Sequence, residues 1–173
     1  VEAVRACQPH RVLEIGTAIG YSALLIAMHA APDAEITTLE LDEERAVRAQ
    51  EYWSRSIYEG KLHLLQGDAG ERLLSLRGKF DFVFIDAAKG QYVDYFHKVL
   101  PLLTEHAVIA ADNVLFRGYV MGSEPAPRRY KTIVKRLREY IELVTHTPGF
   151  KTRIYENGDG LAITRRVSYA EET

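Results

Sequence analysis

Short apolar runs alternate along this chain with longer segments in which apolar residues recur at helical spacing. The runs predict buried strands, and the segments between them predict helices. Strands are expected at residues 11–15, 35–41, 62–66, 80–86 and 107–111. Helices are expected at residues 21–30, 42–58, in a short stretch after 68, and at 91–100 and 127–144. This alternation is typical of a doubly wound α/β sheet with right-handed crossovers and helices on both faces.

The end of the chain has a different pattern. Residues 151–155 and 161–164 have strand character on either side of the turn Asn157-Gly158-Asp159-Gly160. A turn of this composition joins the strands of a hairpin, so the last two strands are expected to be antiparallel. The very apolar run FDFVFID at residues 80–86 predicts a central strand. We expect one Rossmann-like domain over residues 1–173.

The composition is that of an ordinary globular protein, with 47% hydrophobic and 27% charged residues. The net charge of −2 excludes a general polyanion binder, so any such site must be local. The single cysteine, Cys7, allows no intramolecular disulfide and fits a reducing cytoplasm. Cys7 and His10 could form a nucleophilic pair, but both precede the first strand, away from the ligand-binding end of the sheet. No signal peptide and no apolar run of roughly 18 residues is visible, so we expect a cytoplasmic protein without a membrane span.

Ligands of such sheets bind beyond the carboxyl ends of the strands. The first strand carries Glu14 near its end and runs into a turn that contains Gly16, Ala18, Gly20 and Ser22. A dinucleotide fingerprint would have glycine at position 18 to admit a pyrophosphate, whereas this turn has alanine. S-adenosylmethionine has no phosphate, and Glu14 could orient its amino-acid tail directly or through water.

Two further strand ends support a nucleoside ligand. Glu40 closes the second strand, where a carboxylate can accept hydrogen bonds from both ribose hydroxyls. Asp68 and Ala69 follow the third strand, where adenine would lie. The Asp68 carboxylate could bind the adenine amino group, or it could instead cap the helix that follows. The alternative for Glu40 is an unrelated, solvated carboxylate.

A second cluster is expected where the fourth and fifth strands end. Asp86 follows the fourth strand, and Asp112 and Asn113 follow the fifth. Neighbouring parallel strands would bring these oxygen donors together, and such donors without Cys or His suit Mg²⁺ or Mn²⁺ rather than Zn²⁺. Two crowded carboxylates would be costly without a cation. The alternative is an unrelated capping or acid–base role for each residue.

These segments resemble one enzyme family. VLEIGTAIGYSAL, TLELD, FDFVFIDAAKGQYVDYF and VIAADNVLFRGYV are similar to the catechol and caffeoyl-CoA O-methyltransferases of class I. The resemblance covers nearly the whole chain, and it implies a seven-stranded sheet with a reversed final strand, and a homodimer. It implies that Asp86, Asp112 and Asn113 bind a metal and that Lys89 is the base near the acceptor hydroxyl. It also implies cofactor contacts, which match Glu14, Gly16, Ser22, Glu40 and Asp86.

Two qualifications belong to this resemblance. The family's N-terminal helices, which help to cover the cofactor and the substrate, are expected to be missing from this chain. Lys89 could also be an exposed loop lysine without a chemical role.

A further resemblance concerns the substrate. AAKGQY, DNVLFRG and GDGLAIT most resemble bacterial tRNA 5-hydroxyuridine O-methyltransferases, whose acceptor has a hydroxyl beside a carbonyl. Residues 127–140 carry six basic side chains against Glu139, a net +5 that could bind phosphates. The basic residues are Arg128, Arg129, Lys131, Lys135, Arg136 and Arg138. The alternative is a solvated amphipathic helix. Two other functions stay open, namely methylation of small phenols or CoA esters and a non-catalytic S-adenosylmethionine-binding module.

Overall fold

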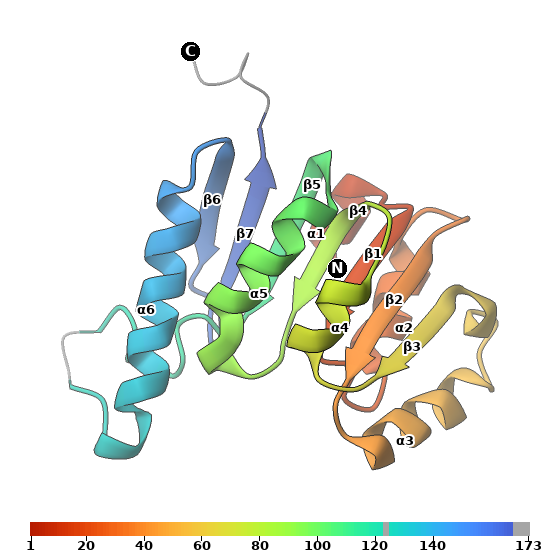
Figure 1. Cartoon of the computed structure of the whole chain (residues 1–173), viewed down its shortest axis with the longest axis horizontal. Helices are drawn as coiled ribbons and strands as arrows, with labels where there is room; N and C mark the ends of the chain where they lie inside the picture. The colour runs from red at the N-terminus through yellow and green to blue at the C-terminus, as the bar shows by residue number, and fades with distance from the viewer. Residues whose placement is uncertain (123–124, 168–173) are drawn as a thin grey trace.

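A seven-stranded sheet forms the centre of the computed structural model, which describes residues 1–122 and 125–167 (Figure 1). The strands are β1 (Arg11–Ile15), β2 (Glu35–Glu40), β3 (Leu62–Gln66), β4 (Phe80–Ile85), β5 (Leu103–Asp112), β6 (Phe150–Tyr155) and β7 (Leu161–Arg166). They lie in the order β3-β2-β1-β4-β5-β7-β6. Strands β1 to β5 are parallel, whereas β7 is antiparallel to both of its neighbours. The predicted Rossmann-like sheet, with β4 at its centre and a reversed last strand, is therefore confirmed.

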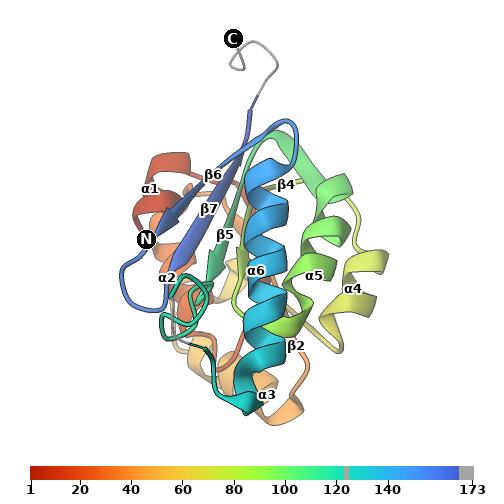
Figure 2. The same cartoon turned by 90° about the vertical axis from the view of Figure 1, so that its left-hand side faces the viewer.

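Helices cover both faces of this sheet. They are α1 (Glu2–Cys7), α2 (Tyr21–His29), α3 (Glu43–Trp53), α4 (Ala69–Ser75), α5 (Tyr92–Val99) and α6 (Lys131–His146). One hydrophobic core lies between the sheet and α4, α5 and α6, and a second lies between the sheet and α1, α2 and α3. Figure 2 shows α5 and α6 on one side of the sheet and α1 and α2 on the other.

The two cores follow from the alternation of side chains along each strand. On β5, Val108 and Ala110 belong to the core beneath α1 and α2, whereas Ile109 and Ala111 belong to the core beneath α5 and α6. The central strands are therefore buried on both faces, which is why their sequences are continuous apolar runs.

Three of the expected boundaries differ from the structure by several residues. Helix α3 ends at Trp53 rather than near residue 58, and Ile57 beyond its end is 90% exposed. Strand β5 begins at Leu103 rather than at 107, because Leu103 pairs with Phe80 across an irregularity in the ladder. Helix α6 begins at Lys131, after a 3₁₀ turn at Arg128–Tyr130.

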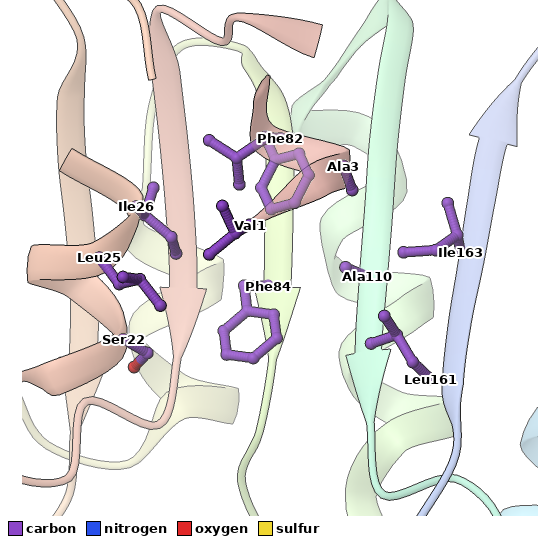
Figure 3. A pocket seen from close by; sticks show the side chains of 11 residues that line it. Val1, Ala3, Ser22, Leu25, Ile26, Phe82, Phe84, Ala110, Leu161 and Ile163 are labelled. Atoms are coloured by element: carbon purple, nitrogen blue, oxygen red, sulfur yellow. The ribbon is translucent and has the colours of Figure 1, made fainter. Parts of the chain in front are cut away.

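The sequence pattern does not predict α1, which lies beside α2. Its Val4 is buried in the core beneath α2. A cavity of about 110 Å³ lies next to α1, and Figure 3 shows the apolar side chains around it, among them Phe82, Phe84 and Ile163. The walls come from α2, β4, β5 and β7, so α1 covers this face of the sheet only in part.

Cys7 and His10 lie near the amino end of β1, as expected, and have separate partners. The Cys7 sulfur lies 3.7 Å from a nitrogen of Arg165, and His10 Nδ1 lies 2.7 Å from an oxygen of Asp33. The geometry therefore offers no cysteine–histidine pair for nucleophilic chemistry. Within residues 1–122 and 125–167, every helix is too short or too polar to cross a membrane.

Candidate active site

Two glycines shape the turn between β1 and α2. Gly16 has φ +102°, and a Cβ built on it would lie 2.1 Å from the Asp86 carbonyl oxygen, so the end of β4 requires glycine there. Gly20 has φ +85°, and its Cβ would lie 2.4 Å from Nε1 of Trp53. That indole nitrogen donates to the Gly20 carbonyl at 3.0 Å. The turn is therefore packed closely against both β4 and α3.

Glu14 lies beneath this turn and is fully buried. Its carboxylate accepts hydrogen bonds from Ser22 Oγ and from Thr38 Oγ1, the second at 2.5 Å. Burial raises the pKa of Glu14 to about 7, although both hydrogen bonds lower it. Through these two hydrogen bonds Glu14 links β1 to α2 and to β2 beneath the turn, and so supports the turn.

Glu40 ends β2 with its carboxylate held on both oxygens. Oε2 accepts from the Ala18 backbone N–H at 2.7 Å, and Oε1 accepts from the Asp42 N–H at 2.9 Å. The Glu40 residue is 7% exposed, yet it lines a cavity of about 290 Å³ beyond the strand ends. A fixed carboxylate at this position can accept hydrogen bonds from the two hydroxyls of a ribose.

Most of the predicted cofactor residues line that cavity. They are Gly16, Ala18, Glu40, Asp68, Ala69 and Asp86. Glu14, Gly20 and Ser22 are absent from its walls, so their direct contact with a cofactor stays a prediction. The expected capping role of Asp68 is confirmed, because Oδ1 accepts from the Glu71 N–H at 3.0 Å as the N-cap of α4. Its contact with adenine stays a prediction.

Sequence reasoning missed several residues of the cavity. They are Leu39, Leu41, Arg45, Ala87, Ala88, Gln91 and Tyr95. Gln91 is the N-cap of α5 and Tyr95 lies on its first turn, and a pattern of strand ends does not point to either residue. Their spacing of four residues on one helix face is the signal that could have grouped them.

The second predicted cluster is also brought together. Ile85 of β4 pairs with Ala111 of β5, so Asp86 and Asp112 follow side by side. Nζ of Lys89 lies 2.9 Å from Asp86 Oδ1, 2.9 Å from Asn113 Oδ1 and 3.1 Å from the Tyr92 hydroxyl. The predicted juxtaposition of strand ends is therefore confirmed, and Lys89 is part of the cluster rather than a free loop residue.

The chemistry of this cluster fits a hard divalent cation. Burial raises the pKa of Asp112, and the nearby Asp86 carboxylate raises it further, so a positive charge would be favourable here. The Lys89 ammonium already lies between oxygens of Asp86 and Asn113. Among the described residues, no three His, Cys, Asp or Glu side chains form a metal-binding group. Two carboxylates and an amide instead leave positions for water or substrate oxygens, as Mg²⁺ prefers.

The basic segment, residues 127–140, has only some of its charged side chains free of partners in the described structure. Arg138 donates to the carbonyls of Val120 and Tyr119 at 2.9 and 3.0 Å. Arg136 and Lys135 both pair with Glu139, at 2.9 and 3.9 Å. The opposite face is apolar: Leu137 lies in the core, and Tyr130, Ile133 and Ile141 pack against it.

Comparison with known proteins identifies relatives of this fold and site. The sequence profile of the O-methyltransferase family matches residues 3–167. A catechol O-methyltransferase of Niastella koreensis is 35% identical over 127 residues, which are 69% of this chain and 58% of that protein. Tapetum-specific methyltransferase 1 of Arabidopsis thaliana is 28% identical over 169 residues, which are 95% of this chain and 72% of that protein. The SAH-bound structure of the Podospora anserina methyltransferase PaMTH1 matches with a TM-score of 0.87 at 28% identity, covering 96% of this chain and 76% of that one.

Proposed function

This chain belongs to the S-adenosylmethionine-dependent O-methyltransferase family, and we propose that it methylates a hydroxyl of an acceptor that has two neighbouring oxygens. The proposal includes a divalent cation, Mg²⁺ or Mn²⁺, held by Asp86, Asp112 and Asn113. One observation carries it: Asp86 lines the cofactor cavity and also contacts Lys89 in the oxygen cluster. A methyl donor in the cavity and an acceptor at the cluster would therefore meet at Asp86.

The walls of the cavity support S-adenosylmethionine as the methyl donor. Glu40 presents a fixed carboxylate for the ribose, and Asp68 presents one for the adenine amino group. Gly16 also lines this cavity, and glycine is required there because a Cβ would lie 2.1 Å from the Asp86 carbonyl oxygen. The PaMTH1 relative is SAH-bound, and SAH is what remains of this donor after methyl transfer.

The oxygen cluster can position and deprotonate the acceptor. Both acceptor oxygens would chelate a divalent cation bound there, and the cation would lower the pKa of the reacting hydroxyl. Asp112 Oδ1 accepts from the Asn113 N–H at 2.7 Å, which fixes the end of β5. Lys89 contacts Asp86 and Asn113, and from this position its neutral amine form could take the proton of the acceptor hydroxyl.

An apolar groove supports a small aromatic acceptor. The groove has a volume of about 590 Å³, reaches Asp112 and includes Phe84, Leu161 and Ile163 in its walls. Leu161 pairs with Asp112 across the β5–β7 ladder, so an apolar surface leads directly to the carboxylate. A catechol combines an apolar ring with two adjacent hydroxyls and would suit this surface. The Niastella koreensis relative is named a catechol O-methyltransferase.

The geometry of the acceptor tests this proposal. The protein would be given labelled S-adenosylmethionine, Mg²⁺ and either catechol or resorcinol, whose hydroxyls are adjacent or separated. We expect transfer to catechol to exceed transfer to resorcinol by about 100-fold or more, because only adjacent oxygens can reach one cation. Equal transfer to the two isomers would contradict the two-oxygen acceptor. Donor binding without transfer to any acceptor would favour a non-catalytic binding module.

The basic segment favours a second candidate, methylation of 5-hydroxyuridine in tRNA. Among the described residues, Arg128, Arg129 and Lys131 have no carboxylate partner, and Arg129 stacks on Tyr130 at 4.6 Å. Free guanidinium and ammonium groups are the side chains that bind phosphates. This candidate shares the cation site and the cofactor site and differs only in the acceptor.

Salt dependence separates the two candidates. If about three basic side chains reach phosphates of an unpaired loop, the log–log slope of tRNA affinity against salt should be roughly −2. Replacing Arg128, Arg129 and Lys131 by Gln should flatten that slope. The matched control replaces Lys135 and Arg136, whose charges already pair with Glu139, and should change it little. Identical slopes for the wild type and the triple variant would contradict the tRNA candidate and leave a small aromatic molecule as the proposed acceptor.

The homodimer implied by the family resemblance also stays a prediction. Light scattering of the purified protein should give twice the monomer mass, and a monomer at all concentrations would contradict it.

A further inference from the structure

The apolar groove beside Asp112 extends well beyond the space that a catechol ring needs. Its volume is about 590 Å³, whereas roughly 150 Å³ is enough to hold a benzene ring. The groove adjoins the cavity of about 110 Å³ next to α1, because Phe84, Leu161 and Ile163 belong to the walls of both (Figure 3). An acceptor that fills the groove must therefore carry more than one ring and two oxygens.

The groove runs along β7 from Asp112 to Arg165. Leu161 pairs with Asp112 across the β5–β7 ladder, and Arg165 pairs with Val108. Leu161, Ile163 and Arg165 are two residues apart along the strand, so they share one face of the sheet, and all three line the groove. Four residues of a strand span about 13 Å, which is the distance along β7 between the two ends of the groove.

The Arg165 guanidinium can bind a ligand at the far end of the groove. The residue is exposed, and its side-chain hydrogen bond within residues 1–122 and 125–167 is a weak one to the Cys7 sulfur, at 3.7 Å. Glu2 and Asp112 also line the groove, but in the described part of the chain neither forms an ion pair with Arg165. The groove thus has the oxygen cluster at one end, apolar walls between, and a guanidinium at the other end.

Further positive charge lies around this far end. Lys151 of β6 pairs with Arg165, and Arg153 pairs with Ile163, so both basic residues share the face on which Arg165 lies. Like charges directly across two strands are unfavourable, and an anion between them would offset this. Guanidinium groups also bind carboxylates and phosphates through two parallel hydrogen bonds. The charges at the far end therefore complement an anionic group.

We propose that the groove binds an acceptor whose apolar spacer ends in an anionic group, and that Arg165 selects for this group. The inference rests on the proposed function, because it places the two adjacent oxygens of the acceptor at Asp112. The spacer lies against Phe84 and Ile163, and a carboxylate or phosphate at its end pairs with Arg165. Since this contact is remote from the reacting hydroxyl, it strengthens acceptor binding and leaves the chemical step unchanged.

Matched pairs of acceptors test the role of Arg165. One pair is a catechol with a four-methylene chain that ends in a carboxylate, and its primary amide. The wild type should use the carboxylate with a KM about three- to tenfold lower than that of the amide and with the same kcat. Arg165→Gln should remove this difference by raising the KM of the carboxylate alone. With a one-methylene chain the acid and the amide should have equal KM, because the anion cannot reach Arg165.

A second long pair ends in a phosphate or in the corresponding alcohol and shows which anion is bound. Preference for one charged end over its neutral partner is expected, and the larger preference identifies that anion. Arg166→Gln is the matched control, because the next residue of β7 holds its guanidinium over the Phe150 ring, on the opposite face of the sheet. It should keep every wild-type KM ratio.

Three results would overturn the proposal. The first is equal KM for the charged and neutral long acceptors in the wild type, and the second is a preference that persists in Arg165→Gln. The third is a lower mass of Arg165→Gln in light scattering, without any preference in the wild type, which would assign this face to a second copy of the chain. In each case transfer to catechol itself would continue. Loss of transfer to catechol in the wild type would overturn the proposed function as well.

Discussion

Nζ of Lys89 lies 2.9 Å from Oδ1 of Asn113, so a lysine that follows β4 reaches the residue that follows β5. Asn113 has φ +57°, a left-handed conformation that asparagine tolerates better than most residues. The Lys89 side chain is 18% exposed and also pairs with Asp86. Asn113 therefore adopts an unfavourable backbone conformation at the place where its side-chain amide contacts Lys89, the proposed base.

Lys89→Met should lower kcat for methyl transfer by roughly 100-fold or more, since general base catalysis typically contributes factors of that size. Affinity for SAH should stay near that of the wild type, because Lys89 is not part of the cofactor cavity. Lys98→Met is the matched control, since Lys98 pairs with Asp94 at 2.7 Å on the same crossover. A wild-type kcat in Lys89→Met would show that another group takes the proton.

Glu40→Ala should weaken binding of S-adenosylmethionine by about tenfold or more, because each lost charge-assisted hydrogen bond contributes roughly 1.5–3 kcal/mol. Calorimetric titration measures the change. Glu44→Ala is the control, because Glu44 pairs with Arg48 on the exposed surface of α3. Equal affinities of Glu40→Ala and the wild type would remove Glu40 from the site.

Glu14 should make the free energy of unfolding depend on pH. Its folded pKa of about 7 lies above the ordinary value of 4.5, so the folded state keeps a proton that the unfolded state has released between these pH values. Stability should therefore fall as pH rises from about 4.5 to 7, by about 3 kcal/mol, and this contribution should be constant above 7. Urea unfolding at pH 5 and pH 7.5 measures it. Glu14→Gln should lose this part of the pH dependence, and an unchanged dependence would contradict the assignment.

Tyr140→Phe should stabilise the protein by about 1 kcal/mol, because the Tyr140 hydroxyl is fully buried and has no partner among the described residues. The ring should keep its edge-to-face contact with Tyr92, whose centroid lies 5.4 Å away. Thermal unfolding measures the effect. A lower midpoint in Tyr140→Phe would mean that the hydroxyl has a stabilising partner.

The strand-end residues could be predicted from the sequence because parallel strands place their carboxyl ends at one edge. Glu40, Asp86 and Asp112 each end or follow an apolar run, and the structure places all three at that edge. Tyr95 could not be found in this way. It belongs to a crossover helix, and its approach to the cavity depends on how α5 packs against α4.

Glu14 shows how much the strand pattern could have added. The period of two along β1 places Glu14 on the same face as Val12, beneath α2, whereas Leu13 and Ile15 face the other core. That alternation already indicates a carboxylate that faces the core beneath α2. Its partners Ser22 and Thr38 come from separate elements, so only the tertiary structure could identify them.

The requirement for a divalent cation decides whether the oxygen cluster takes part in methyl transfer. Methyl transfer to catechol would be measured in a chelator and then with increasing Mg²⁺ or Mn²⁺, for the wild type and Asp112→Asn, while SAH binding is followed in parallel. We expect no transfer in the chelator, recovery with either metal, and a higher metal requirement in Asp112→Asn. SAH binding should not change in the chelator, because the cofactor cavity and the oxygen cluster share only Asp86. Full transfer to catechol in the chelator would contradict a role for a divalent cation in methyl transfer.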